Sequence, residues 1–149
     1  KERIIKVSNF LGYMLERAAE HRMKGILLIG HLGKLVKVAG GIFHTHSRVA
    51  DARMEILAAY AGLAGAPTDV IRRIYAAKTT GEAAAVIDQE GLDDIYERIV
   101  QNSSRRCMDH TFGAINTATV LFNEENRLLF QDEQADTLIK ELQSEDKQK

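Results

Sequence analysis

The feature that most limits the fold of this chain is a short apolar run, Ile26 to Ile29, which has a glycine on each side. A continuous run of four apolar residues between glycines is typical of a strand that is buried on both faces of its sheet. Strands of this kind belong to α/β domains, in which helices cover the sheet. We therefore expect residues 26–29 to form a buried strand of an α/β domain.

A second apolar run stands near the beginning of the chain. The β-branched residues of segment 4–7 predict a strand. Ser8 or Asn9 can cap the helix that follows, whose apolar residues recur at helical spacing until about Arg22. A strand, a helix and a second strand make a βαβ unit, so we expect the two strands to be parallel.

Helical periodicity governs the middle of the chain. We expect a short helix over residues 32–39 and a longer one from Ser47 to about Ala64. Thr79 and Glu82 have the spacing of a capping box and predict the start of another helix. The longer helix should bury Ala52, Ile56, Ala59, Tyr60 and Leu63, and a later helix should bury Leu92, Ile95, Tyr96, Ile99 and Val100.

The period changes again near the carboxyl end. Residues 118–122 and 127–130 predict two strands joined by a turn, and residues 133–142 predict a last helix. We expect one α/β domain over residues 1–143, followed by a flexible polar tail at 144–149. The predicted fold is a Rossmann-like open sheet with a parallel βαβ start, a helical middle and a carboxyl-terminal strand pair.

Composition excludes several classes of protein. The net charge is −1, with 20 Lys and Arg against 21 Asp and Glu, so we expect no nucleic-acid or membrane partner. The single cysteine, Cys107, excludes an internal disulfide framework and is typical of the reducing cytoplasm. We expect a soluble, cytoplasmic protein that could form a homo-oligomer.

The segment GHLGK at residues 30–34 follows the predicted buried strand and opens a helix. The carboxyl ends of strands in open α/β sheets are where ligands bind, and small residues let a ligand approach the backbone. The spacing matches neither a Walker A loop nor GxGxxG, because only two residues separate Gly30 from Gly33. A tight turn chosen for its geometry alone is the competing interpretation.

Charged side chains gather on both sides of this segment. Lys34 and Lys37 are three residues apart, so one helix face can carry both and recognise carboxylates or phosphates. Arg48 and Asp51 could pair at the same spacing beside Arg53 and fix a guanidinium for carboxylate recognition. Solvated lysines and an ordinary surface ion pair are the alternatives.

Two histidines follow at residues 44 and 46, and extended backbone would point both side chains the same way. With His31 they could suggest a metal site, but no cysteine lies close by in sequence and His-x-His is a weak metal motif. We expect hydrogen bonding to a substrate, or loop packing, and no protein-bound metal. Cys107 and His110 lie far from this cluster and form no recognisable nucleophile–base pair.

Three segments of the first 55 residues form a distinctive set: SNFLG at 8–12, GHLGKLVK at 30–37, and THSR at 45–48 with ADARME at 50–55. In order and spacing they resemble the CbiD family, the cobalt-precorrin-5B C1-methyltransferases of anaerobic cobalamin biosynthesis. The resemblance implies methyl transfer from S-adenosylmethionine to carbon 1 of cobalt-precorrin-5B, giving cobalt-precorrin-6A. It also implies that this chain is the carboxyl-terminal part of a longer protein whose amino-terminal domain is absent, so the isolated piece could be inactive.

The resemblance also suggests roles for individual residues. The many acetate and propionate groups of the macrocycle would explain the crowded basic side chains, and the cobalt would belong to the substrate. We expect catalytic roles for His46 and Asp51, with His44 ranked lower, and cofactor contacts from Gly30, His31 and Gly33. The expected substrate contacts are Lys34, Lys37, Thr45, Ser47, Arg48 and Arg53.

Two other functions remain open. A non-catalytic anion- or nucleotide-binding α/β domain would use the same glycine-containing turn. A purely structural domain would leave the chemistry to the rest of the protein.

Overall fold

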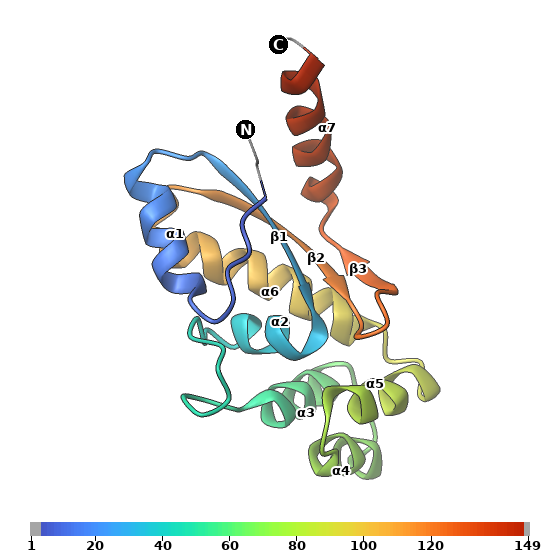
Figure 1. Cartoon of the computed structure of the whole chain (residues 1–149). Coiled ribbons are helices and arrows are strands. Elements are labelled where there is room, and N and C mark those ends of the chain that lie inside the picture. Colours follow the sequence, from blue (N-terminus) through green and yellow to red (C-terminus); the bar gives the residue numbers. More distant parts are fainter. Residues whose placement is uncertain (1–3, 148–149) are drawn as a thin grey trace.

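The computed structural model describes residues 4–147, without the side chains of 142 and 145–147. The first half of the described chain runs α1 (Leu11–Glu20), β1 (Gly25–His31), α2 (Leu32–Ala39), α3 (Arg53–Leu63) and α4 (Thr68–Ala76). The second half runs α5 (Thr80–Gln89), α6 (Asp94–His110), β2 (Asn116–Phe122), β3 (Leu128–Gln131) and α7 (Glu133–Lys147). Figure 1 shows α3, α4 and α5 gathered at the end of the molecule opposite to both termini.

The sheet has the order β1-β2-β3. β1 and β2 are parallel from Gly25 beside Asn116 to His31 beside Phe122, and all the helices from α2 to α6 lie in the connection between them. β2 and β3 are antiparallel, with an irregularity between Leu121 and Phe122. The α/β class, the helical middle and the carboxyl-terminal strand pair are therefore confirmed.

The predicted strand over residues 4–7 is wrong. These residues form no regular structure, and Ile4 keeps 85% of its surface exposed. Val7 is the residue of this segment that packs against the core. β-branched residues favour a strand only when a neighbouring strand and a core are there to receive them. The predicted βαβ start is therefore wrong as well, because the parallel partner of β1 is β2.

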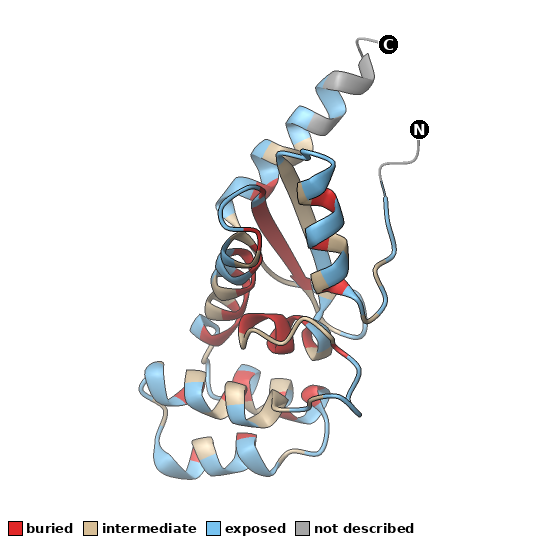
Figure 2. Ribbon diagram, turned by 90° about the vertical axis from the view of Figure 1, so that its left-hand side faces the viewer, coloured by how far each residue is buried: buried red, intermediate tan, exposed pale blue. Residues whose placement is uncertain are grey.

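The strand that is buried on both faces is β2, whereas the sequence pointed to β1. Residues 117–121 of β2 are all buried, while no residue of β1 is, and Ile29 is 61% exposed. Figure 2 shows this buried strand beside the helices that cover it. Within residues 4–147, β2 has a neighbour on each side and β1 has one. The apolar run identified a strand correctly but not its place in the sheet.

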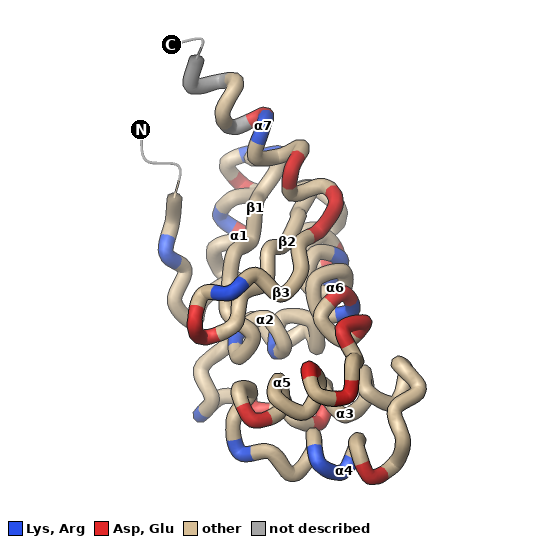
Figure 3. Tube along the Cα trace, turned by 90° about the vertical axis from the view of Figure 1, so that its right-hand side faces the viewer, with Lys and Arg blue, Asp and Glu red and all other residues tan. Residues whose placement is uncertain are grey.

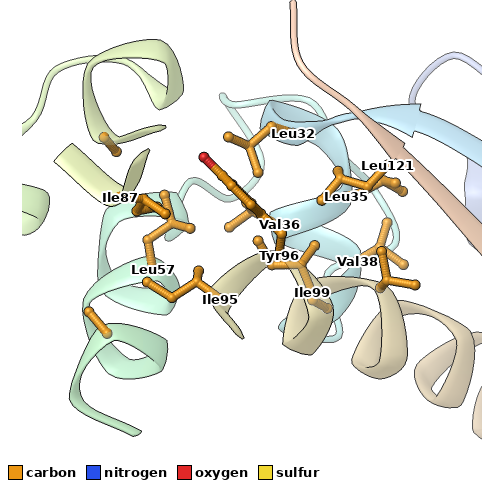
Figure 4. Packing of buried hydrophobic residues seen from close by; sticks show 14 of the residues in the cluster. Leu32, Leu35, Val36, Val38, Leu57, Ile87, Ile95, Tyr96, Ile99 and Leu121 are labelled. Atoms are coloured by element: carbon orange, nitrogen blue, oxygen red, sulfur yellow. The ribbon is translucent and has the colours of Figure 1, made fainter. Parts of the chain in front are cut away.

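The core lies between α2 and α6. Val36 and Ile99 have no exposed surface, and Leu57 and Ile87 close the core from α3 and α5. Figure 4 shows the α2 side chains pointing toward those of α6. Full burial of such a side chain contributes roughly 1.5–3 kcal/mol, so this contact fixes the position of α2.

Two helices differ from their predicted burial or length. α3 buries Leu57 and Ala61, while Ala59 and Leu63 of the predicted stripe are exposed. The apolar residues of α3 itself occur on nearly every face of the helix, so their periodicity could not indicate which face is buried. α7 continues to Lys147, so residues 144–147 of the predicted tail are helical, and residues 148–149 lie outside the described residues.

Candidate functional site

A cavity of about 410 Å³ lies where the parallel strands β1 and β2 end. His31 ends β1 and Glu124 follows the end of β2, and both line this space, which we call the first cavity. The predicted ligand edge of the sheet therefore holds a cavity. The lining is completed by Asn9, Gly33, Lys34, Lys37, Thr45, His46, Ser47 and Arg53.

Lys37 is the most deeply buried charged group of this lining, with 3% of its surface exposed. Its Nζ donates hydrogen bonds to the backbone oxygens of Thr45, at 3.1 Å, and Ala50, at 3.0 Å. Burial lowers the pKa of the Lys37 ammonium, and the nearby Asp51 carboxylate opposes this effect. Lys37 thus fastens the segment 44–52 to helix α2.

Lys34 lies on the same helix but is exposed to the cavity. Its Nζ donates to Asn9 Oδ1 and, at 3.3 Å, to Thr45 Oγ1. The Thr45 hydroxyl also donates to Asn9 Oδ1, at 3.3 Å, and the Thr45 backbone N–H donates to Asn9 O at 3.1 Å. The amino-terminal segment, α2 and the segment 44–52 therefore meet at one polar cluster.

The segment 44–52 is a loop, although the sequence predicted a helix from Ser47. Its tightest part is a turn in which the Val49 N–H donates to His46 O at 2.9 Å. The Arg48 backbone N–H donates to His46 Nδ1 at 3.1 Å, so the neutral ring carries its proton on Nε2. His46 is therefore arranged as a hydrogen-bond donor through Nε2.

The helix begins only at Arg53, and this changes the predicted ion pair. Asp51 pairs with Arg53 instead of Arg48, through two hydrogen bonds of 2.8 Å from Nε and Nη2 of the guanidinium. These hydrogen bonds hold the pKa of the Asp51 carboxyl below its ordinary value and raise the pKa of Arg53. The bidentate pair fixes the Arg53 guanidinium at the cavity wall.

The glycine-containing segment 30–34 forms no separate turn, because β1 runs directly into α2 at Leu32. A Cβ on Gly30 would lie 3.0 Å from Leu35 Cγ, so packing explains that glycine. His31 donates from Nε2 to Asn126 Oδ1 at 2.9 Å, and its Nδ1 lies 3.8 Å from Glu124 Oε2. Gly33 lines the cavity and His31 stands at its rim.

Most of the predicted site residues therefore meet at one cavity: His31, Gly33, Lys34, Lys37, Thr45, His46, Ser47 and Arg53. Gly30, Arg48 and Asp51 lie outside its lining. Sequence reasoning missed Asn9 and Glu124 as site residues. Asn9 belongs to the segment 8–12 that carries part of the family resemblance, whereas nothing in the sequence near Glu124 indicated its role.

The other reactive residue types lie apart from the cavity. His44 packs edge-on against Phe10 at 5.1 Å between ring centroids, and its Nδ1 is buried without a partner among the described residues. Burial raises the pKa of Cys107 to about 12, and His110 pairs with Glu16. Across residues 4–147, no three His, Cys, Asp or Glu side chains are grouped so that they could hold a metal ion. Nor does this part of the chain contain a helix with the length and apolar character needed to cross a membrane.

Known proteins resemble the chain over most of its length. The cobalt-precorrin-5B C(1)-methyltransferase of Alkaliphilus metalliredigens is 42% identical over 142 residues, which cover 95% of this chain and 38% of the relative. The enzymes of the same name from Desulfitobacterium hafniense and Moorella thermoacetica are 46% and 44% identical, covering 84% and 89% of this chain and 33% and 36% of the relatives. The chain thus spans about a third of the length of these curated relatives. No solved structure gives a significant match.

The family model described as "CbiD, C-terminal domain" matches residues 44–133. This range holds α3 to α6 and both later strands, while β1 and the two lysines of α2 precede it. β1 nevertheless pairs with β2, so the sheet joins both sides of that boundary. The match covers more than half of the chain, and this chain belongs to the CbiD family.

Proposed function

We propose that this chain is part of a methyltransferase that moves a methyl group from S-adenosylmethionine to carbon 1 of cobalt-precorrin-5B, giving cobalt-precorrin-6A. The observation that carries the proposal is the cationic first cavity at the carboxyl ends of β1 and β2. Relatives that match this chain bear the name of that enzyme. A Rossmann-like description of the open sheet is part of the same proposal, because the cavity occupies the edge where such sheets bind ligands.

The chemistry of the first cavity suits one edge of a polycarboxylate macrocycle. Lys34 and the fixed guanidinium of Arg53 face a space of about 410 Å³, which is small for a whole tetrapyrrole. We assign this space to a few acetate or propionate arms. Ser47 supplies a hydroxyl donor, whereas the Thr45 hydroxyl donates to Asn9 and accepts from Lys34, and so supports the lysine. Arg48 lies outside the lining, and Lys37 holds the loop that carries these residues.

S-adenosylmethionine, when bound, supplies its methyl as an electrophile: the bond to carbon 1 forms while the S–CH₃ bond breaks, its electron pair returns to sulfur, and one proton leaves the macrocycle. The chain itself then has to position the substrate and neutralise its carboxylates. This transfer requires no covalent bond between the substrate and the protein. The cobalt is part of the substrate, with His31 or His46 near enough to the cavity to face it.

His46 and Asp51 are our candidates for catalytic roles, and their contacts distinguish the two. His46 can direct its Nε2–H at a substrate oxygen, because Nδ1 accepts from the Arg48 N–H. Asp51 stays ionised beside Arg53 and acts by orienting that guanidinium. Of the expected cofactor contacts, Gly33 and His31 line the cavity, and Gly30 supports them from β1.

The proposal is tested with a chimera in which this chain replaces the matching 142 residues of the Alkaliphilus metalliredigens relative. We expect the chimera to methylate cobalt-precorrin-5B with labelled S-adenosylmethionine. Arg53→Met should raise the KM for the macrocycle by about tenfold, because a charged hydrogen-bond donor is lost. The matched control is Arg72→Met on the exposed face of α4, which should leave the KM unchanged.

A folded chimera that transfers no methyl group, beside an active parent, would contradict the proposal. Retained binding of polycarboxylates by that inactive chimera would then favour the non-catalytic anion-binding domain.

A further inference from the structure

A second cavity, of about 270 Å³, lies against the first one. It is bounded by α5, from Thr80 to Asp88, and by the turn between β2 and β3. Glu124 lines both cavities. Figure 3 shows acidic residues beside a basic one on that turn, next to α5.

Gly33 stands where the two cavities meet. A Cβ at this position would lie 3.4 Å from Thr80 Oγ1, 3.6 Å from Glu124 Oε1 and 3.8 Å from Arg53 Nη1. Thr80 belongs to the second cavity, Arg53 to the first, and Glu124 to both. The absence of a side chain at Gly33 therefore leaves a gap of the size of a Cβ atom between groups that line the two cavities.

Thr80 gives the second cavity a polar group that a ligand can reach. Its residue is 5% exposed, it lines the cavity, and its hydroxyl has no hydrogen-bond partner among residues 4–147. The hydroxyl is not fully enclosed, so a ligand or a water in the cavity can reach it and hydrogen-bond with it.

The walls of the second cavity have two different characters. Gly81 and Ala84 lie about one turn apart on α5, and with Ala85 they form a low surface that suits a planar ring, beside the charged Asp88. The opposite wall carries the carboxylates of Glu124 and Glu125 and the guanidinium of Arg127, which is paired with Asp88 of α5 at 3.0 Å. A ligand that fits both walls has a flat, neutral part and a positive centre.

We propose that the second cavity binds the nucleoside end of a nucleoside sulfonium, with the planar base against Ala84 and Ala85, a sugar hydroxyl at Thr80, and the sulfonium beside Glu124 at the Gly33 junction. This inference rests on the proposed function. It assigns the methyl donor to the second cavity and leaves the first cavity to the substrate. The donor sulfur then faces the first cavity across Gly33, and the substrate edge approaches from the other side. Of the three residues that the sequence predicted to contact the methyl donor, Gly30, His31 and Gly33, only Gly33 contacts it in this proposal.

The test is calorimetric titration of this chain with S-adenosylhomocysteine, the thioether that methyl transfer leaves behind. We expect micromolar binding by the unmodified chain, about tenfold weaker binding by Thr80→Val, and no measurable binding by Ala85→Leu, whose side chain would fill the cavity. The matched control is Ala59→Leu, which adds the same atoms at an exposed position of α3 outside both cavities. Thermal unfolding of each variant checks that it is folded.

The difference in affinity between a charged and a neutral ligand gives a second readout, which would not change if Glu124 had only a structural role. The unmodified chain should bind S-adenosylmethionine several-fold more tightly than S-adenosylhomocysteine, because Glu124 faces the sulfonium, and Glu124→Gln should bring the two affinities together. The absence of binding by the folded, unmodified chain would overturn the inference, and so would binding that Thr80→Val and Ala85→Leu both leave unchanged. If the chimera is active but one of these two negative titration results is found, only this inference is contradicted. If the chimera is inactive but the titrations give the expected results, only the proposed function is contradicted.

Discussion

The two cavities share a wall but are built in different ways. The first is organised by a buried cation, since Lys37 holds two backbone oxygens of the loop 44–52 with 3% of its surface exposed. The second is bordered by carboxylates near solvent, and the Glu124 side chain, which lines both, is 61% exposed. The first cavity has its wall fixed before any ligand arrives, whereas the second is bordered by the exposed carboxylates of Glu124 and Glu125, which can adjust.

This difference matches what each ligand would require. Fixed donors favour a ligand with several anionic arms, because the cost of ordering the protein has been met during folding. An exposed carboxylate contributes little to stability, but its side chain can move to contact a sulfonium ligand. That ligand is positively charged when it binds and neutral when it leaves after methyl transfer. The structure thus separates a cavity with fixed donors from one bordered by exposed carboxylates.

Replacing the buried lysine should have the largest effect. Lys37→Met leaves the backbone oxygens of Thr45 and Ala50 without their donor, and each unpaired buried group costs about 1–3 kcal/mol. We expect a loss of about 2–4 kcal/mol in the free energy of unfolding, measured with urea. Lys34→Met, one turn away and exposed, should lose less than about 1 kcal/mol. Equal losses in the two variants would mean that the burial of Lys37 does not fix the wall of the first cavity.

Two glycines of the α2 segment should respond in opposite directions. A Cβ on Gly40 would lie 2.4 Å from Ile56 Cδ1, so Gly40→Ala should cost about 1–2 kcal/mol through overpacking. Gly33 meets only ordinary contacts, and within a helix alanine is favoured over glycine by up to about 1 kcal/mol, so Gly33→Ala should fold at least as well. Urea unfolding gives both values. Binding of S-adenosylhomocysteine should nevertheless weaken in Gly33→Ala, and unchanged binding would show that the cavities do not communicate at this position.

The wall of the second cavity depends on the start of α5. The Glu82 N–H donates to Thr79 Oγ1 at 3.1 Å, and the Glu82 carboxylate accepts from the Lys78 N–H at 2.8 Å, which confirms the predicted cap. Thr79→Ala should cost about 1 kcal/mol in thermal or urea unfolding. Thr68→Ala is the matched control, because Thr68 begins α4, where no side-chain cap is formed. A Thr79→Ala protein as stable as the control would mean that the cavity wall does not rely on this cap.

Local chemistry made much of this molecule predictable. Helical spacing located α2 and placed Lys34 and Lys37 on it, and the Thr79–Glu82 pattern gave the start of α5. The apolar run at 26–29 identified β1, and the strand-to-helix connection after it led to the site. Each of these signals lies within about one helical turn or one strand of the residues it describes.

What could not be predicted depends on residues that are distant in sequence. Glu124 reaches the first cavity because β1 and β2 are parallel with His31 beside Phe122, a register that no local pattern specifies. Lys37 is buried because the loop 44–52 covers it, so its spacing from Lys34 could not separate their roles. The segment 4–7 has strand propensity but no neighbouring strand, and propensity alone was misleading there.

The smallest expected effect concerns the Asp51–Arg53 pair at the edge of the first cavity. The hydrogen bonds from Arg53 lower the pKa of the folded Asp51 carboxyl below its ordinary value near 3.8. The pair therefore stabilises the fold above that value, and its contribution is lost as the pH falls through the lower, folded pKa. Because the carboxylate is partly exposed, the stability difference between the unmodified chain and Asp51→Asn should be below about 1 kcal/mol at pH 7 and should vanish once the pH lies below the folded pKa. Urea unfolding of both proteins across this range measures it. A difference that stays constant with pH would mean that Asp51 acts through packing rather than charge, and the guanidinium at the first cavity would then be as free to move as the carboxylates of the second.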